Sequence, residues 1–183
     1  LPPMPQKPDT IVACIPQVAK PDTANLANGT DPGNYYDYVQ FINLAQNLND
    51  FNTIKPTLDR WNTLGLGLNA LLLKQASNKQ NTGGQVILNL GGRPGLGSLT
   101  QMFIDFGYAV NPEKDIVSSI VQQDPQTDIQ PLAMIEEPQG MRFEFFTNPD
   151  GTEQISATQA KYLMDNSQTV YHAIYQIRGT KLQ

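Results

Sequence analysis

Apolar residues recur three or four positions apart between residues 34 and 80, and this spacing predicts two helices. The first carries its apolar positions from Tyr38 to Leu48. The second begins near Pro56, because proline suits the first turn of a helix. Its apolar stripe consists of Leu58, Trp61, Leu64, Leu68, Leu71 and Leu72. Gly65 and Gly67 interrupt this stripe, so they indicate either a close helix crossing or a break.

The middle of the chain predicts a short strand between helices. Gln85 to Leu90 is the strand, and a glycine-rich loop from Gly91 to Gly97 follows it. Ser98 and Gln101 are spaced as in a capping box, which predicts the start of a helix of about two turns. Another helix is expected after Asn111-Pro112-Glu113, with the apolar face Ile116, Val117, Ile120 and Val121.

Alternation with a period of two returns in the last third of the chain. Residues 126–140 resemble a polar linker with one short strand at Leu132 to Ile135. Apolar and polar residues then alternate over 141–147, which predicts a strand followed by a tight turn at Asn148-Pro149-Asp150-Gly151. Ser156 and Gln159 form a second capping box and open a helix, and 169–177 predicts a final strand.

The first 33 residues contain seven prolines, which exclude a continuous helix there. We expect an extended arm over 1–33, in which Thr10 to Ile15 adds as a strand to a sheet edge; a disordered leader is the alternative. Residues 34–183 are expected to form one compact α+β domain, mainly helical over 34–125 and with a hairpin, helix and strand over 126–183. The predicted sheet is small and antiparallel.

The polar composition is unusual, because 33 asparagines and glutamines stand against 12 basic and 17 acidic residues. The charged fraction of 16% lies below the roughly 25% of ordinary soluble domains. The net charge is −5 and the basic residues are scattered singly, so we expect no direct binding to nucleic acid. No apolar run is long enough to span a bilayer, and a single cysteine excludes an intramolecular disulfide.

The loop after the predicted strand has the context of a phosphate-binding loop, since it lies between a strand and a helix. The lysine of that motif is missing, because Ser98 follows Gly97 directly, and Pro94 removes one N–H group. A tight structural turn is the simplest interpretation. The alternative is contact with an anion or a partner at the helix N-terminus through Gly92, Arg93, Gly95, Gly97 and Ser98.

The other chemistry-bearing residues predict no catalytic group, no metal ligand set and no cofactor. His172 is the only histidine and stands among apolar neighbours, so a structural role is expected, and a pair with Cys14 lacks an activating context. The adjacent acids Glu136 and Glu137 are expected on a solvated surface, and Glu144 has no distinguishing context.

Tyrosines suggest an interface, because they combine an apolar ring with a polar tip. Interface aromatics are expected at Tyr35, Tyr36, Tyr38, Tyr171 and Tyr175, with a half-buried core edge as the alternative.

Together these features favour a non-enzymatic structural subunit of a larger assembly, most plausibly of a virion or phage, whose partners are copies of itself or other protein subunits. The first alternative is a secreted or periplasmic module that binds glycan or peptide. The second is an enzyme that uses the loop over 91–98 on a phosphorylated ligand. We expect Leu1 and Gln183 to be either ends produced by processing of a longer precursor or the limits of a piece taken from a longer protein.

Overall fold

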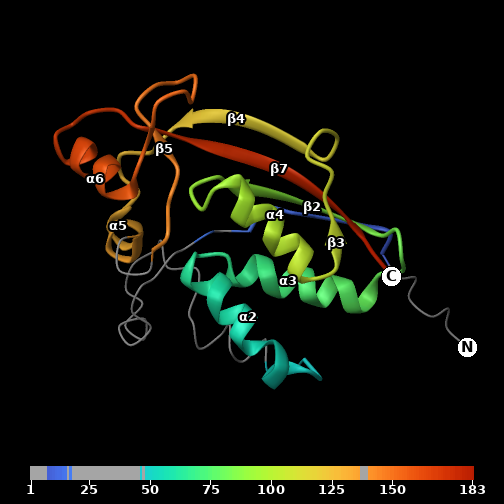
Figure 1. Ribbon diagram of the computed structural model, residues 1–183. Coiled ribbons are helices and arrows are strands. Elements are labelled where there is room, and N and C mark those ends of the chain that lie inside the picture. The colour runs from blue at the N-terminus through green and yellow to red at the C-terminus, as the bar shows by residue number, and fades with distance from the viewer. Residues whose placement is uncertain (1–7, 16, 18–45, 47, 137–139) are drawn as a thin grey trace, which may run out of the picture.

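The computed structural model describes residues 8–15, 17, 46, 48–136 and 140–183 (Figure 1). This part of the chain holds five helices and a seven-stranded mixed sheet, which confirms the predicted α+β class. The helix predicted from Tyr38 to Leu48 and most of the predicted arm lie outside the described residues. The elements are β1 (Thr10–Ala13), α2 (Phe51–Thr63), α3 (Gly67–Lys79), β2 (Gln85–Gly91), α4 (Leu96–Asp105), β3 (Tyr108–Ala109), β4 (Ile116–Gln122), α5 (Gln130–Glu136), β5 (Phe145–Phe146), β6 (Gln154–Ile155), α6 (Ala157–Asp165) and β7 (Tyr171–Lys181).

The longest strand, β7, organises the sheet. It pairs antiparallel with β2 from Gln85↔Thr180 to Gly91↔Ile174 and with β4 from Ile116↔Ile177 to Gln122↔Tyr171. The short strands β3 and β5 also pair with β7, and β6 pairs with β5. The strand predicted within the arm is confirmed as β1, which pairs parallel with β2 and makes the sheet mixed instead of purely antiparallel.

The helix predicted after Asn111 is wrong, because its apolar face belongs to β4. Asn111 caps only a turn: its side-chain oxygen accepts a hydrogen bond from the Glu113 N–H at 3.0 Å. The β-branched residues of Ile-Val-Ser-Ser-Ile-Val fit a strand better than a helix, and β7 offers a full row of backbone partners. Ile116 and Ile120 are four positions apart, as are Val117 and Val121, and this spacing occurs on one face of a helix and on one face of a strand. The pairing with β7 therefore decides that these residues form a strand.

Backbone turns at glycine move two predicted helix boundaries. Gly65 has φ 75° and breaks the predicted long helix into α2 and α3. Because α2 begins at Phe51, Pro56 lies inside it and not in its first turn. Gly95 has φ 82° and is the N-cap of α4, which therefore begins at Leu96. The capping box predicted at Ser98 is wrong for this reason, whereas the one at Ser156 is confirmed, with both of its hydrogen bonds present.

Helices α3 and α4 lie on one face of the sheet, with α2 beyond α3 and with α5 and α6 at one end of β7 (Figure 1). The buried residues 86, 88 and 90 of β2 alternate with more exposed ones and pack against these helices. A second apolar cluster joins α5 and α6 to Phe143, Phe145 and Val170. No helix within the described ranges is long and apolar enough to cross a membrane.

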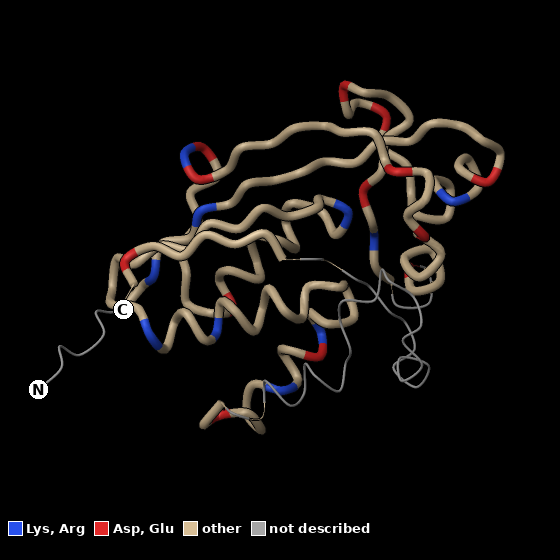
Figure 2. The backbone as a smooth tube through the Cα atoms, turned by 180° about the vertical axis from the view of Figure 1, so that it is seen from behind, with Lys and Arg blue, Asp and Glu red and all other residues tan. Residues whose placement is uncertain are grey.

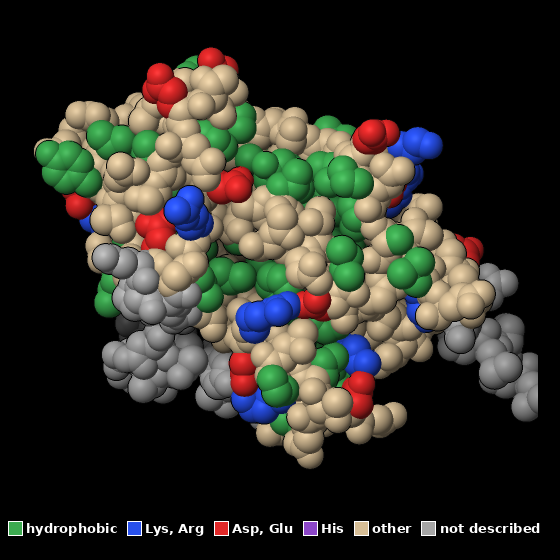
Figure 3. Space-filling view, viewed as in Figure 1, with side chains coloured by type: hydrophobic (Ala, Val, Ile, Leu, Met, Phe, Trp, Pro, Cys, Tyr) green, Lys and Arg blue, Asp and Glu red, His purple; other side chains and the backbone are tan. Residues whose placement is uncertain are grey.

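The surface matches the low charge of the sequence. In the described part of the chain, Lys, Arg, Asp and Glu are spread along the backbone tube and form no basic stripe (Figure 2). In the space-filling view most of the visible face consists of uncharged polar side chains and backbone, between small apolar areas (Figure 3). This face of the folded molecule is therefore largely uncharged.

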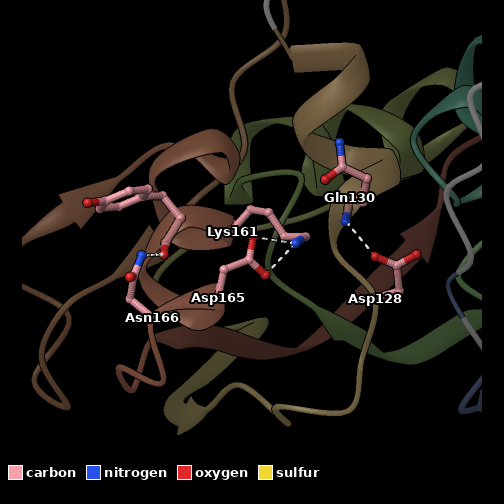
Figure 4. A network of polar contacts seen from close by, with 6 residues as sticks. Asp128, Gln130, Lys161, Asp165 and Asn166 are labelled. Carbon is pink, nitrogen blue, oxygen red and sulfur yellow. Dashed lines mark hydrogen bonds and ion pairs between the residues drawn. The ribbon is translucent and has the colours of Figure 1, made fainter.

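The short strand predicted at Leu132 to Ile135 is wrong, because these residues form α5. The Asp128 carboxylate accepts a hydrogen bond from the Gln130 N–H at 2.9 Å and caps the start of the helix (Figure 4). Leu132 and Ile135, three positions apart, are both buried in the cluster with α6. At the C-terminal end of α6, the side-chain amide of Asn166 donates a hydrogen bond to the Tyr162 carbonyl at 2.8 Å.

Candidate functional site

The carboxyl ends of the parallel pair β1 and β2 lie at the same edge of the sheet. The two chain segments that leave this edge are joined by one side chain: Gln17 Nε2 donates to the Gly91 carbonyl at 3.2 Å, and the Gly91 N–H donates to Gln17 Oε1. In open α/β sheets, ligands bind in the crevice outside the carboxyl ends of parallel strands. This edge is therefore a candidate position for a ligand site.

The loop that follows β2 is held tightly against β7. The Gly92 N–H donates to the Ala173 carbonyl at 2.7 Å, and the Gly95 N–H donates to the Gly92 carbonyl at 2.8 Å. A Cβ atom at Gly92 would lie 2.6 Å from Cε2 of Tyr175 and 2.9 Å from the Ala173 carbonyl oxygen. The loop can approach β7 this closely only because position 92 carries no side chain.

Arg93 connects the loop to the ends of β4 and β7. Its Nε donates to Gln123 Oε1 at 2.9 Å, and its guanidinium lies 3.4 Å from His172 Nε2. His172 Nδ1 lies 2.8 Å from the Ala173 carbonyl, which can only accept, so Nδ1 carries the proton and Nε2 accepts from Arg93. Gln123 and His172 are buried, so these contacts form an internal polar cluster.

The pKa of His172 is lowered from its ordinary 6.5 to about 4, mainly by burial and then by the positive charge of Arg93, while the hydrogen bond with the Ala173 carbonyl acts in the opposite direction. Burial also lowers the pKa of Arg93, which nevertheless stays charged. The histidine is therefore neutral at physiological pH, as its acceptor role towards Arg93 requires.

Because of the lowered pKa of His172, we expect the free energy of unfolding to decrease in weak acid. Because the folded pKa of about 4 lies below the unfolded value of 6.5, the contribution is complete above about pH 6.5 and falls as the pH drops towards 4. The expected loss is about 3 kcal/mol in the free energy of unfolding, measured by urea titration at a series of pH values.

The matched variant is His172→Gln, which keeps an acceptor for Arg93 but does not titrate. It should lack this part of the pH dependence. Glu144, whose pKa is raised, contributes with the opposite sign in both proteins, so the difference between them isolates the histidine. Parallel pH profiles for the two proteins would contradict the assignment.

A cavity of about 410 Å³ opens between the start of α4 and the segment over 140–144. Its volume falls within the range of roughly 300–1,000 Å³ that is typical of small-molecule sites. It is lined by Leu64, Pro94, Gly95, Gly97, Ser98, Gly140, Met141, Arg142 and Glu144. Gly92 and Arg93 do not line it, because Arg93 is turned towards β4 and β7.

Glu144 is the acidic group of this cavity. Its carboxylate lies against Gly95, since a Cβ atom there would be 2.8 Å from Glu144 Oε1. Partial burial raises the pKa of Glu144, and its charge adds to the burial that raises the pKa of Tyr175. The carboxylate thus faces the N-terminal end of α4, which makes this end less attractive to a second anion.

The structure separates the residues predicted for anion or partner contact into two groups. Gly95, Gly97 and Ser98 line the cavity, whereas Gly92 and Arg93 anchor the loop. Tyr171 and Tyr175 lie half-buried on β7, and the positions predicted at residues 35, 36 and 38 fall outside the described residues.

The sequence does not mark Gln17, Gln123 or Arg142 as site residues, and it presents Glu144 only as an acid without distinguishing context. For Arg142 and Glu144 a signal existed, because their alternation with phenylalanines predicts one side of a strand. Nothing local marked Gln17 or Gln123, whose partners are 74 and 30 positions away. Within the described ranges, no group of three or more His, Cys, Asp or Glu side chains could hold a metal ion.

No family-level sequence profile matches the chain. The chain is similar to several curated proteins. It is 26% identical to methionine S-methyltransferase of Hordeum vulgare over 166 residues, which cover 91% of this chain and 14% of that protein. The same figures hold for methionine S-methyltransferase of Zea mays. The protein of the same name from Arabidopsis thaliana is 27% identical over 152 residues, 83% of this chain and 13% of that protein. The chain thus spans about one seventh of the length of the curated relatives it matches.

This similarity overturns the function predicted from composition. The chain resembles enzymes over nine-tenths of its length, so the predictions of a non-enzymatic virion or assembly subunit and of a glycan or peptide module are wrong. The alternative of an enzyme acting on a phosphorylated ligand through Arg93 fails as well, because the relatives are methyltransferases by name and Arg93 contacts Gln123 and His172.

Proposed function

We propose that this chain forms a methyltransferase-like domain, related to the methionine S-methyltransferases, that takes part in methylating a thioether sulfur. The observation that carries the proposal is the similarity to proteins of this name, which runs through 91% of the chain rather than through one motif. The chain spans about one seventh of the length of these relatives, so methyl transfer by this chain is itself part of the proposal.

The chemistry of this reaction agrees with the residues present. A thioether sulfur carries no proton, so its lone pair can form the new S–CH₃ bond without a general base. The bond between the methyl group and its donor breaks at the same time, and its electron pair leaves with the donor. Catalysis then rests on alignment and exclusion of water, which need a rigid, shaped site and no nucleophilic side chain.

The geometry supports a site at the carboxyl edge of β1 and β2. The loop after β2 is fixed by Gly92 and Arg93, and the cavity over 140–144 opens directly beside it. We propose that Gly95, Gly97 and Ser98 contact a ligand there, and that Gly92 and Arg93 keep the loop in place. The Glu144 carboxylate argues for a ligand with a positive group at this point, not for a phosphate.

A methyl-transfer assay tests the proposed function. The protein is incubated with S-adenosylmethionine labelled in its methyl group and with L-methionine, and labelled S-methylmethionine is measured by mass spectrometry. We expect product that increases with time and protein concentration. Label that never exceeds the level of the reaction without protein, for L-methionine and for other thioethers alike, would reject the proposal.

We further propose that the macromolecular partners of this domain are proteins, either copies of itself or other subunits, and not nucleic acid. The absence of a basic stripe in the described part of the chain and the net charge of −5 support this (Figure 2). We also retain the organisation of an arm over 1–33 and one domain over 34–183 as a proposal, with β1 as the point where the arm joins the sheet.

A further inference from the structure

We propose that the cavity between α4 and the segment over 140–144 binds a zwitterionic α-amino acid with an unbranched apolar side chain. In this assignment Glu144 pairs with the ammonium group, Arg142 pairs with the carboxylate, and the side chain lies against Leu64 and Met141. The inference rests on the proposed function, in which methionine is the methyl acceptor, but it concerns binding and has its own test.

Two opposite charges line the cavity from one short segment. Arg142 and Glu144 are two positions apart just before β5, and both residues line the cavity. The neighbouring Phe143 and Phe145 are buried at 1% and 0% exposure. Burial of the phenylalanines therefore anchors the segment that carries the charged pair.

The backbone of this segment is held by hydrogen bonds at two adjacent residues. The Glu144 N–H donates to the Arg93 carbonyl at 2.7 Å, and the Phe143 N–H donates to Glu136 Oε1 at 3.0 Å. A binding group held by such contacts loses little conformational freedom when a ligand arrives. The anchor at Arg93 thus also positions Glu144.

Both charges are available for a ligand. Within the described residues, neither Glu144 nor Arg142 makes an ion pair, and no side-chain hydrogen bond to the Glu144 carboxylate is present. A partly buried carboxylate without a partner is costly, and an ammonium group would remove this cost. The exposed guanidinium of Arg142 suits a bidentate contact with a carboxylate.

The remaining lining suits the rest of such a ligand. Leu64, Pro94 and Met141 supply apolar surface, and a volume of about 410 Å³ accommodates a molecule of methionine's size. An anionic ligand such as a phosphate would meet the Glu144 carboxylate, and a purely apolar ligand would leave both charges unpaired. A zwitterion with an apolar tail satisfies all three parts of the lining.

The test combines variants with ligands that lack one charge. Isothermal titration calorimetry compares L-methionine with N-acetyl-L-methionine, which has no ammonium group, and with L-methioninol, which has no carboxylate. We expect Glu144→Gln to weaken L-methionine at least about tenfold while leaving N-acetyl-L-methionine nearly unchanged. Arg142→Gln should weaken L-methionine similarly and leave L-methioninol nearly unchanged.

Matched controls come from the exposed turn before β4. Glu113→Gln and Lys114→Gln change the same charges away from the cavity and should bind L-methionine as the unmodified protein does. Equal losses for all ligands in Glu144→Gln, or no binding of L-methionine by the unmodified protein, would overturn the inference. Circular dichroism verifies that each variant is folded.

The two proposals can fail separately. If the charge-matched losses are found but no methyl transfer occurs, the amino-acid site stands and the proposed function falls. If methyl transfer occurs and both cavity variants keep the KM for L-methionine of the unmodified protein, the function stands and the site assignment falls.

Discussion

Replacing Glu136 with alanine is expected to lower the free energy of unfolding by about 3–5 kcal/mol. The Glu136 carboxylate accepts hydrogen bonds from the N–H groups of Phe143 at 3.0 Å, Ala157 at 3.0 Å and Thr158 at 3.1 Å. Its exposure is 7%, so water cannot replace these bonds. The change leaves three backbone donors without an acceptor and removes a negative charge from the N-terminus of α6.

Urea unfolding measures this loss, with Glu153→Ala as the matched control. Glu153 is exposed and accepts a hydrogen bond from the Thr147 hydroxyl, so its removal should cost less than about 1 kcal/mol. Glu136→Gln, which keeps one acceptor atom, should fall between the two. Equal stabilities of the Glu136→Ala and Glu153→Ala proteins would show that the carboxylate does not join α5, α6 and the segment before β5.

Replacing Arg93 with alanine is expected to cost about 2–4 kcal/mol of stability, because the buried acceptors Gln123 Oε1 and His172 Nε2 lose their donor. Removal of the neighbouring positive charge should also move the pKa of His172 upward from about 4. Since the chain has one histidine, its ring signals in an NMR titration report this shift without ambiguity.

Arg142→Ala is the control for this experiment, because Arg142 is exposed and makes no ion pair within the described residues. Its stability should stay within about 0.5 kcal/mol of the unmodified protein. If Arg93→Ala is as stable as Arg142→Ala and the histidine pKa does not move, then Arg93 is not an anchor and its guanidinium is free for a ligand.

Arg93 and Glu136 both have partners that local sequence patterns do not reveal. Arg93 was singled out because it lies in a glycine-rich loop between a strand and a helix, and the local context was right. Its partners, however, come from positions 123 and 172, and no local pattern links them to residue 93. Glu136 was expected on a solvated surface, and this is wrong because α5 and α6 pack so that its carboxylate meets three backbone N–H groups.

The excess of amides was interpreted as a sign of contact rather than of chemistry. The folded molecule does present a largely uncharged face (Figure 3). The number of acid–base groups, however, does not decide whether a chain takes part in catalysis. A reaction at a thioether, as proposed here, needs alignment rather than proton transfer, so a low count of such groups carries no information about it.

The sequence by itself determined the α+β class, the strands β1, β2 and β7 and the cap of α6, and at Gly65 it offered a break as one of two alternatives. These features depend on local periodicity, on glycine conformation or on hydrogen bonds between residues close in the chain. Only the tertiary structure decided that 116–122 is a strand, that Arg93 faces inward and that Arg142 and Glu144 share a cavity. In each of these cases the deciding partner lies far away in the sequence, and its position exists only once the sheet and the helices have packed.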